Sequence, residues 1–327
     1  MRAVVLEKKG GPEVLTIREV PDPVPGPEEL LVRLRGSALN RADLLQRRGL
    51  YPGPPAEFEI PGLEYAGVVE AVGDRVRAFA PGDEVMGIVG GSAHAELVAV
   101  HERTALRVPE GIDVADAAAI PEVFLTAFDA LVVQGGLSSG RWALVHAGAS
   151  GVGTASIQIA KALGARIAVT TSSGKVDACR DLGADVVIDY TTTDFGEAVA
   201  AATDRDGVDV VLDVIGGEYT VRNIKSLRTG GRIIQVGVMG EGTVELPLGL
   251  LMPKRAGIIG TVLRARPLEE KAALTQRFAA ELLPRFDDGT LQPVIDSRFA
   301  FDEIATAHER MEANANVGKI LLTFRTG

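Results

Sequence analysis

The middle of the chain alternates short apolar runs with amphipathic segments, and this alternation constrains the fold more than any other feature. Apolar runs predict strands, and the segments between them predict helices that often end at a glycine. The predicted strands are Trp142–Ala147, Arg166–Thr171, Val186–Ile188, Val208–Leu212, Arg232–Val236 and Gly257–Val262. The predicted helices are Gly153–Leu163, Lys175–Leu182, Glu197–Ala202 and Asn223–Leu227. Such a pattern predicts a parallel sheet covered on both faces, a doubly wound α/β domain.

A glycine-rich turn joins the first of these strands to the first helix. It consists of Gly148, Ala149, Ser150, Gly151, Val152 and Gly153. Glycines let the backbone approach a pyrophosphate, which the free N–H groups and the dipole of a helix N-terminus favour. The spacing is G-x-x-G-x-G rather than the usual G-x-G-x-x-G, but strand, turn and helix follow in the required order. The sequence therefore predicts a dinucleotide site, with a tight turn in an unrelated α/β protein as the alternative.

The next strand indicates which nucleotide binds. Enzymes that use NAD usually carry an acid near the end of this strand for the ribose 2′-hydroxyl. Here the strand runs into Ser172, Ser173, Gly174 and Lys175, with no acid before Asp177. Hydroxyls and a lysine suit a 2′-phosphate, so the sequence favours NADPH. The alternative makes Ser173 a helix N-cap and Lys175 a solvated residue, although the helix dipole disfavours a cation in the first turn.

The flanking parts of the chain predict a second domain. Short alternating runs up to about residue 118, such as Leu30–Leu34 and Tyr65–Val72, are separated by Gly and Pro clusters and predict a compact β-barrel or sandwich. Ala115–Gln134 is predicted to be a helix with Asp113 as its N-cap, and Leu268–Phe286 a long helix. The tail from Val294 on is expected to pack back on the first domain. The predicted domains are 1–118 with 267–327, and 119–266.

Composition excludes several classes of function. The formal net charge of −10, from 44 acids and 34 bases, argues against nucleic-acid binding. The single cysteine, Cys179, excludes an internal disulfide and a four-cysteine zinc site. The N-terminus lacks a signal-peptide pattern, and the uncharged stretch Trp142–Ala160 is too poor in large apolar residues for a membrane span. We therefore expect a cytoplasmic protein without membrane association.

Several segments, taken together and in order, resemble the zinc-free medium-chain dehydrogenases/reductases, and most closely their quinone oxidoreductase branch. The matching segments are ALNRADLLQRRGLYPGPP, PGLEYAGVVEAVG, FAPGDEVMG, FLTAFDAL, HAGASGVGTASIQIAKALGA, LGADVVIDY, DVIGG, GGRIIQVG and NVGKILL. The run from Ala38 to Pro55 is most similar to the p53-inducible group of quinone oxidoreductases. The resemblance implies a GroES-like β-barrel domain, a Rossmann domain, and a cofactor between them.

The resemblance also implies roles for individual residues. The turn from Gly148 to Gly153 would hold the pyrophosphate, and Ser172, Lys175 and Tyr190 would bind the 2′-phosphate. The nicotinamide would be lined by Thr126, Ile215, Gly216, Gly237 and Val238, with Lys319 approaching from the tail. Two of these residues have an alternative role: Tyr190 as a lid on the sheet edge, and Lys319 as a strand-edge lysine.

The departures from zinc-dependent relatives predict that this chain holds no metal. Asn40 stands near the position of a ligand cysteine, and Leu63 replaces the histidine before Glu64. Catalytic zinc generally needs three protein ligands, and the spacing of the four histidines (His94, His101, His146 and His308) supplies no cluster. His146 is expected to be a packed or backbone-bonded side chain, and Arg41 and Asp43 are candidates for a structural pair.

Without zinc, hydride transfer to an activated acceptor is easier than alcohol oxidation. The predicted activity is NADPH-dependent reduction of a quinone, an enone or another activated carbonyl compound. Asn40 and Tyr51 are the candidate catalytic residues, because the resemblance places them beside the nicotinamide. The alternatives are an enoyl-thioester or 2-alkenal reductase and a non-enzymatic, crystallin-like NADPH-binding protein. The resemblance further implies a homodimer that forms through the apolar segment Thr243–Val262.

Overall fold

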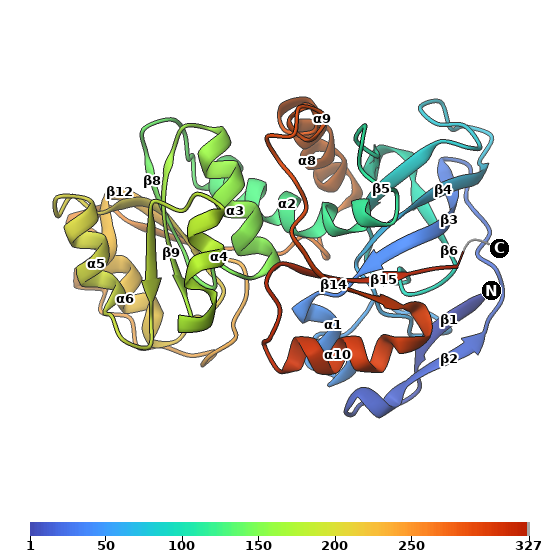
Figure 1. Ribbon diagram of the computed structural model, residues 1–327, viewed down its shortest axis with the longest axis horizontal. Helices are drawn as coiled ribbons and strands as arrows, with labels where there is room; N and C mark the ends of the chain where they lie inside the picture. Colours follow the sequence, from blue (N-terminus) through green and yellow to red (C-terminus); the bar gives the residue numbers. More distant parts are fainter. Residues whose placement is uncertain (326–327) are drawn as a thin grey trace. The chain divides into compact units, whose positions relative to one another are not determined.

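The computed structural model describes residues 1–325, which divide into two compact units (Figure 1). One unit combines Met1–Leu125 with the chain from Arg264 on, and the other consists of Thr126–Leu263. The second unit is thus inserted into the chain of the first. The domain boundaries given above remain predictions about where each functional domain begins.

The inserted unit is built on a six-stranded parallel sheet with the order β10-β9-β8-β11-β12-β13. The strands are β8 (Trp142–Val145), β9 (Arg166–Thr171), β10 (Val186–Asp189), β11 (Val208–Asp213), β12 (Leu227–Gln235) and β13 (Gly257–Gly260). The order reverses beside β8, which has β9 on one side and β11 on the other. In open α/β sheets, ligands bind outside the carboxyl ends of the strands at such a switch point.

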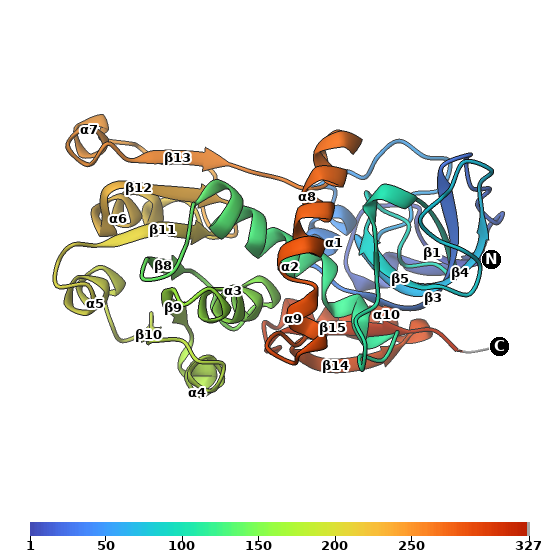
Figure 2. The ribbon, with the colours of Figure 1, turned by 90° about the horizontal axis from the view of Figure 1, so that it is seen from above.

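Helices cover both faces of this sheet, which confirms the doubly wound fold. They are α3 (Gly151–Ala162), α4 (Val176–Asp181), α5 (Phe195–Ala202), α6 (Glu218–Ser226), α7 (Leu251–Lys254) and the π-helix η4 (Asp129–Gln134). Figure 2 shows α5 and α6 on one face of the sheet and α3 and η4 on the other. Because both faces are covered, every residue of β8 and β11 is buried, which accounts for the apolar residues of both strands, with Asp209 and Asp213 of β11 as the buried exceptions.

The other unit contains a mostly antiparallel seven-stranded sheet and a two-stranded hairpin. Its strands are β1 (Arg2–Leu6), β2 (Leu15–Glu19), β3 (Glu29–Ala38), β4 (Glu64–Val72), β5 (Glu84–Ile88), β6 (Leu97–His101), β7 (Ala105–Arg107), β14 (Ile295–Ala300) and β15 (Lys319–Thr323). The tail packs back on the N-terminal part as expected, because β15 pairs with β3. The strand pairing of residues 1–325 leaves this sheet open and does not close it into a barrel.

Short helices complete this unit. They are α1 (Arg41–Arg47), α2 (Pro121–Phe128, which continues into the inserted unit), α8 (Leu268–Glu281), α9 (Pro284–Asp287), α10 (Ile304–Glu312) and the 3-10 turns η1 (Pro12–Val14), η2 (Glu102–Thr104), η3 (Asp116–Ala119) and η7 (Phe301–Glu303). Leu39, just before α1, and Leu44, within it, pack with Ile304 of α10 and Ile320 of β15. The N-terminal and C-terminal parts of the chain therefore share one core.

Two predicted long helices are interrupted. The predicted helix Ala115–Gln134 is divided into η3, α2 and η4. Pro121 lacks an N–H and restricts the residue before it, so it begins a new helix. The second predicted helix, Leu268–Phe286, likewise ends at Glu281, and Pro284 begins α9.

Candidate functional site

Most residues predicted to bind a cofactor in the inserted unit lie just after the carboxyl end of a strand. The glycine turn follows β8, Ser172 and Lys175 follow β9, Tyr190 follows β10, Ile215 and Gly216 follow β11, and Gly237 and Val238 follow β12. The parallel topology therefore brings these separated segments to one edge of the sheet. This is the edge at which doubly wound sheets bind nucleotides.

The glycine turn has the geometry of an anion-binding helix start. Ser150 is the N-cap of the 12-residue helix α3, and its Oγ accepts the N–H of Gly153 at 3.0 Å. A Cβ on Gly148 would lie 2.6 Å from Val169, and one on Gly153 would lie 2.4 Å from the carbonyl oxygen of Ala147. Both positions therefore require glycine. The first N–H groups of a helix have no partner within it, so this turn presents donors suited to a phosphate.

The end of β9 differs in detail from the prediction. Ser172, not Ser173, is the N-cap of a 3-10 turn, η5 (Ser173–Lys175), and Lys175 is the N-cap of α4. Lys175 therefore precedes the α-helix instead of occupying its first turn, because the chain inserts the 3-10 turn first. β9 itself ends in Thr171 without an acid, as the sequence indicated.

The neighbouring strand supplies an acid at this end of the sheet. Asp189 ends β10, and its Oδ1 accepts both the N–H and the hydroxyl of Thr191, at 2.9 and 2.7 Å. Hydrogen bonds from Ser173 and Thr191 lower the pKa of this exposed carboxyl. Tyr190 follows directly and is half exposed, while its N–H donates to the carbonyl oxygen of Thr171. The ring is thus accessible beside β9, where a nucleotide would bind.

The remaining predicted residues of this unit surround the ends of β11 and β12. The N–H groups of Ile215 and Gly216 both donate to Asp213 Oδ1. Gln235 Nε2 donates to the carbonyl oxygen of Gly237, and Val238 is half exposed. Thr126 is buried in α2.

His146 is buried, but its side chain is bonded to side chains and not to the backbone as one alternative had it. Its Nδ1 lies 3.0 Å from Thr170 Oγ1 and its Nε2 lies 2.7 Å from Asn223 Oδ1. Burial lowers the pKa of His146. The ring is therefore neutral at physiological pH and belongs to a buried network instead of facing a substrate.

In the other unit, Lys319 is the centre of a buried polar cluster. Its Nζ donates to Glu64 Oε1 at 2.7 Å, to Asn40 Oδ1 at 2.7 Å and to the carbonyl oxygen of Leu39 at 2.6 Å. Asn40 Nδ2 also donates to Glu64 Oε1 at 2.9 Å. The interpretation of Lys319 as a strand-edge lysine is wrong, since β15 lies between β14 and β3 and the side chain is buried. The amide of Asn40 is therefore held rigidly by its neighbours.

Leu63, where the resemblance leads us to expect a histidine in zinc-dependent relatives, and His94 both lie in the protein interior. Leu63 is buried, and His94 Nδ1 lies 2.9 Å from Ser37 Oγ. Burial lowers the pKa of His94. Within residues 1–325, no group of three His, Cys, Asp or Glu side chains could hold a metal ion. The expected pair of Arg41 and Asp43 is not formed in this part of the chain, because Arg41 donates to Asn314 while Asp43 accepts the N–H groups of Asn40 and Gly62.

Tyr51 is held by an arginine that the sequence did not indicate. The guanidinium of Arg264 lies over the Tyr51 ring at 4.8 Å from its centroid. Arg264 also donates to the carbonyl oxygen of Gly90 at 2.7 Å and to Gln46 Oε1 at 3.0 Å. Burial raises the pKa of Tyr51, and the positive Arg264 opposes this shift. The hydroxyl therefore stays protonated and can donate a hydrogen bond.

Glu122, at the start of α2, is a second residue that the sequence did not indicate. Its N–H donates to Glu64 Oε2 at 2.8 Å. Burial raises the pKa of its carboxyl to about 8, and the nearby Glu64 adds to the shift. The charged and titratable groups that influence this carboxyl, or are influenced by it, are Glu64, Lys319, Asp43, Arg264, Tyr51 and Lys271. The carboxyl is thus an uncharged acid near Tyr51 at neutral pH.

Neither of these two residues could be found from local sequence. Arg264 is 213 positions from Tyr51, and no motif links them. Glu122 follows an ordinary helix-starting proline. The raised pKa of its carboxyl arises only where α2, β4 and β15 meet. The one signal in the sequence was that Glu122 is a charged residue in an otherwise apolar segment.

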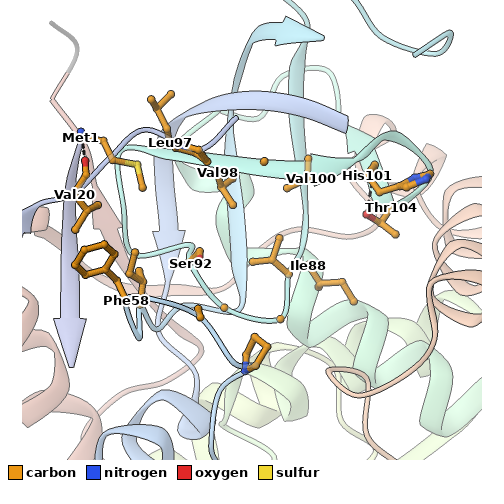
Figure 3. Close-up of a pocket in the computed structure, with 18 of the residues that line it drawn as sticks. Met1, Val20, Phe58, Ile88, Ser92, Leu97, Val98, Val100, His101 and Thr104 are labelled. Atoms are coloured by element: carbon orange, nitrogen blue, oxygen red, sulfur yellow. Dashed lines mark hydrogen bonds between the residues drawn. The ribbon is translucent and has the colours of Figure 1, made fainter. Parts of the chain in front are cut away.

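A separate cavity of about 550 Å³ opens in the same unit (Figure 3). Its walls are largely apolar and include Phe58, Ile88, Leu97 and Val100. Tyr51 and Asn40 do not line it. The cavity is therefore distinct from the polar cluster around Lys319 and from the position of Tyr51.

Comparisons with protein families and with individual known proteins indicate the same family. Residues 26–110 match the alcohol dehydrogenase GroES-like domain, and residues 182–322 match the zinc-binding dehydrogenase family. The chain is 33% identical to human quinone oxidoreductase over 98% of this chain and 97% of that protein. The chain belongs to the quinone oxidoreductase branch of the medium-chain dehydrogenase/reductase superfamily.

Solved structures that are similar to this chain agree with this family assignment. A quinone oxidoreductase from Escherichia coli, solved in complex with NADPH, is 28% identical, with a TM-score of 0.89 over 99% of this chain and 100% of that one. An NAD-dependent alcohol dehydrogenase is 34% identical, with a TM-score of 0.87 over all of both chains. These two family members differ in the cofactor and substrate that their descriptions give, so neither property follows from the fold alone. No helix within residues 1–325 is long and apolar enough to cross a membrane.

Proposed function

We propose that this chain is an NADPH-dependent oxidoreductase that transfers hydride to quinones or to other activated carbonyl acceptors. The observation that carries the proposal is the nucleotide edge of the inserted sheet. Its glycine turn suits a pyrophosphate, and the strand that would carry an acid for NAD ends in Thr171 and is followed by Ser172. The quinone oxidoreductases of human and Escherichia coli support the same reaction class.

The predicted cofactor residues fit NADPH at this edge. Ser172 and Lys175 provide hydroxyl and cationic groups for a 2′-phosphate, and the half-exposed Tyr190 can stack beside the adenine. Asp189 is the one feature that would suit a ribose hydroxyl, but Ser173 and Thr191 already engage it. The residue composition therefore favours NADPH over NADH.

In the proposed reaction, the bound cofactor supplies hydride from its nicotinamide ring. Hydride addition to a quinone, or to the β-carbon of an enone, leaves negative charge on the acceptor oxygen. The protonated hydroxyl of Tyr51 can donate a hydrogen bond to that oxygen, and Arg264 fixes the tyrosine ring. The side-chain amide of Asn40 is held by Lys319 and Glu64, so its proposed part is to shape the site and not to move during the reaction.

A substrate panel tests the proposal. Purified protein is mixed with NADPH or NADH and with a quinone, an enone, crotonyl-CoA or a simple alcohol with oxidised cofactor, and the absorbance of the reduced nicotinamide is followed. We expect the fastest turnover with NADPH and a quinone. Preference for crotonyl-CoA would identify an enoyl-thioester reductase, and rapid alcohol oxidation would overturn the reductase assignment. Tight NADPH binding without any turnover would indicate a non-enzymatic protein. Elemental analysis of the same sample tests the expected absence of zinc.

A further inference from the structure

A chain of buried polar side chains crosses the carboxyl edge of the inserted sheet from β9 to β11. Thr170 Oγ1 lies 3.0 Å from His146 Nδ1, His146 Nε2 lies 2.7 Å from Asn223 Oδ1, and Asn223 Nδ2 donates to Asp213 Oδ2 at 2.9 Å. All four residues are at most 2% exposed. We call them the β9–β11 network.

The network has one consistent direction of donation. The pKa of His146 is lowered by burial, so the ring carries a single N–H. That N–H lies on Nε2 and donates to Asn223, which leaves Nδ1 to accept the hydroxyl of Thr170. The amide of Asn223 then donates to Asp213. Every member is thus satisfied, and the removal of any one leaves a buried group without a partner.

The two ends of the network meet different parts of the nucleotide edge. At one end, the carbonyl oxygen of Thr170 accepts the N–H of Gly148 in the glycine turn at 2.8 Å. At the other end, Asp213 Oδ1 accepts the N–H groups of Ile215 and Gly216 at 2.6 and 3.1 Å. Gly216 and Gly217 have φ values of 74° and 55°, a conformation that only glycine adopts readily. Asp213 therefore binds the backbone of Ile215 and Gly216 directly, at the start of a glycine pair whose conformation other residues rarely adopt.

We infer that Asp213 is a positioning residue for the nicotinamide side of the cofactor site, and that Asn223 and His146 fix the orientation of its carboxylate. This inference rests on the proposed function, because it assigns the Ile215–Gly216 segment to the nicotinamide. The network does not touch the cofactor itself. Instead, it fixes the backbone of Ile215 and Gly216, which would contact the cofactor. It fixes this segment relative to the glycine turn, which would hold the pyrophosphate.

Two variants test the inference. Asp213→Asn keeps the size of the side chain but presents an NH₂ group either to the segment or to the amide of Asn223. Asn223→Leu removes both hydrogen bonds of the amide at nearly constant volume. Lys225→Ala, an exposed position on the same helix, is the matched control. Thermal unfolding with each variant verifies folding, and Asp213→Asn carries the test if Asn223→Leu does not fold.

The measurement compares two ligands that occupy different parts of the site. 2′,5′-ADP occupies only the adenosine side, and NADPH also occupies the nicotinamide side. We expect Asp213→Asn and Asn223→Leu to weaken NADPH binding by about tenfold, while the affinity for 2′,5′-ADP changes by less than about twofold. The control should bind both ligands as the parent does.

Three results would overturn the inference. Equal losses for both ligands would make the network a general support of the inserted unit. Unchanged NADPH affinity would remove any positioning role. A parent protein that binds 2′,5′-ADP but gains nothing from the nicotinamide would show that Ile215–Gly216 does not contact it. A parent that binds neither ligand would instead refute the proposed function.

Discussion

We expect the hydroxyl of Tyr51 to donate a hydrogen bond to the oxyanion that develops on the acceptor in the proposed reaction. Arg264 contacts the face of its ring, so Tyr51→Phe removes the hydroxyl while the stacked ring remains. The loss of an oxyanion donor can cost ~3 kcal/mol in a dry site, and less where water can replace it. We expect quinone kcat to fall about tenfold, with NADPH affinity unchanged. Steady-state kinetics and cofactor titration measure both quantities, and undiminished turnover would reduce Tyr51 to a packing residue.

The acid Glu122 makes a prediction about stability and pH. Its pKa is about 8 in the folded chain and about 4.5 when solvated, so between these pH values the folded state holds a proton that the unfolded state has lost. The free energy of unfolding should therefore decrease as pH rises from about 4.5 to about 8, through this group alone. Glu122→Gln cannot titrate and lacks this contribution.

Denaturant unfolding of the parent and Glu122→Gln across this range measures the effect. We expect the variant to gain stability relative to the parent as pH rises, by on the order of a few kcal/mol, with no further change above about pH 8. The other ionisable residues are the same in both proteins, so the difference between the two pH profiles reports mainly on Glu122. Parallel pH profiles would show that Glu122 ionises normally.

At the scale of single residues, the sequence predicted those that the local geometry of the chain requires. Gly148 and Gly153 are required by the turn between β8 and α3, and that requirement is readable from six consecutive residues. Arg264 and Glu122 were missed because their environments are created by contacts between distant segments. A pKa raised by burial depends on what surrounds the carboxyl, and no local pattern encodes that.

At the scale of elements, apolar runs located the strands well. β8 and β11 are buried on both faces, which favours apolar residues there, and the two aspartates of β11, Asp209 and Asp213, are compensated by hydrogen bonds. The helices were less well predicted. α6 begins at Glu218, five residues before the predicted start, because its polar first turn follows Gly216 and Gly217 and hides the periodicity. The interruptions at Pro121 and Pro284 were readable from the prolines themselves.

The connection between β9 and α4 yields a prediction about cofactor choice. Lys175 lies at the N-cap of α4, directly after the end of β9, where the 2′-phosphate is expected to bind. A charge-assisted hydrogen bond contributes ~1.5–3 kcal/mol, so Lys175→Ala should weaken NADPH binding by roughly tenfold to a hundredfold. NADH affinity should hardly change.

Calorimetric titration with both cofactors measures this difference. Arg180→Ala is the control, since it removes a positive charge from the last turn of the same helix, where Arg180 pairs with Asp177. It should alter NADPH affinity less than twofold. Equal losses of NADPH and NADH in Lys175→Ala would argue against a phosphate contact.

At the scale of the whole molecule, exposed apolar side chains concentrate in one region of the inserted unit. They are Val238, Met239, Leu248, Met252, Ile258 and Val262. β13 lies within this region at the edge of the six-stranded sheet and pairs only with β12 among the described strands. An unprotected, apolar sheet edge favours pairing with another chain. Leu248, Met252, Ile258 and Val262 lie within Thr243–Val262, the segment for which the family resemblance implies a dimer contact, and that contact stays a prediction.

We therefore predict a homodimer in which the β13 strands of two copies lie side by side. Ile258 is exposed on this edge strand, and a lysine there would introduce charge where two copies meet. Sedimentation at micromolar concentration should give the mass of a dimer for the parent and shift toward the monomer for Ile258→Lys. Val24→Lys is the matched control, because Val24 is 88% exposed and lies in the other unit, so its dimer should persist. A monomeric parent would contradict the prediction. Monomerisation by both variants would indicate that added charge, and not the β13 edge, governs association.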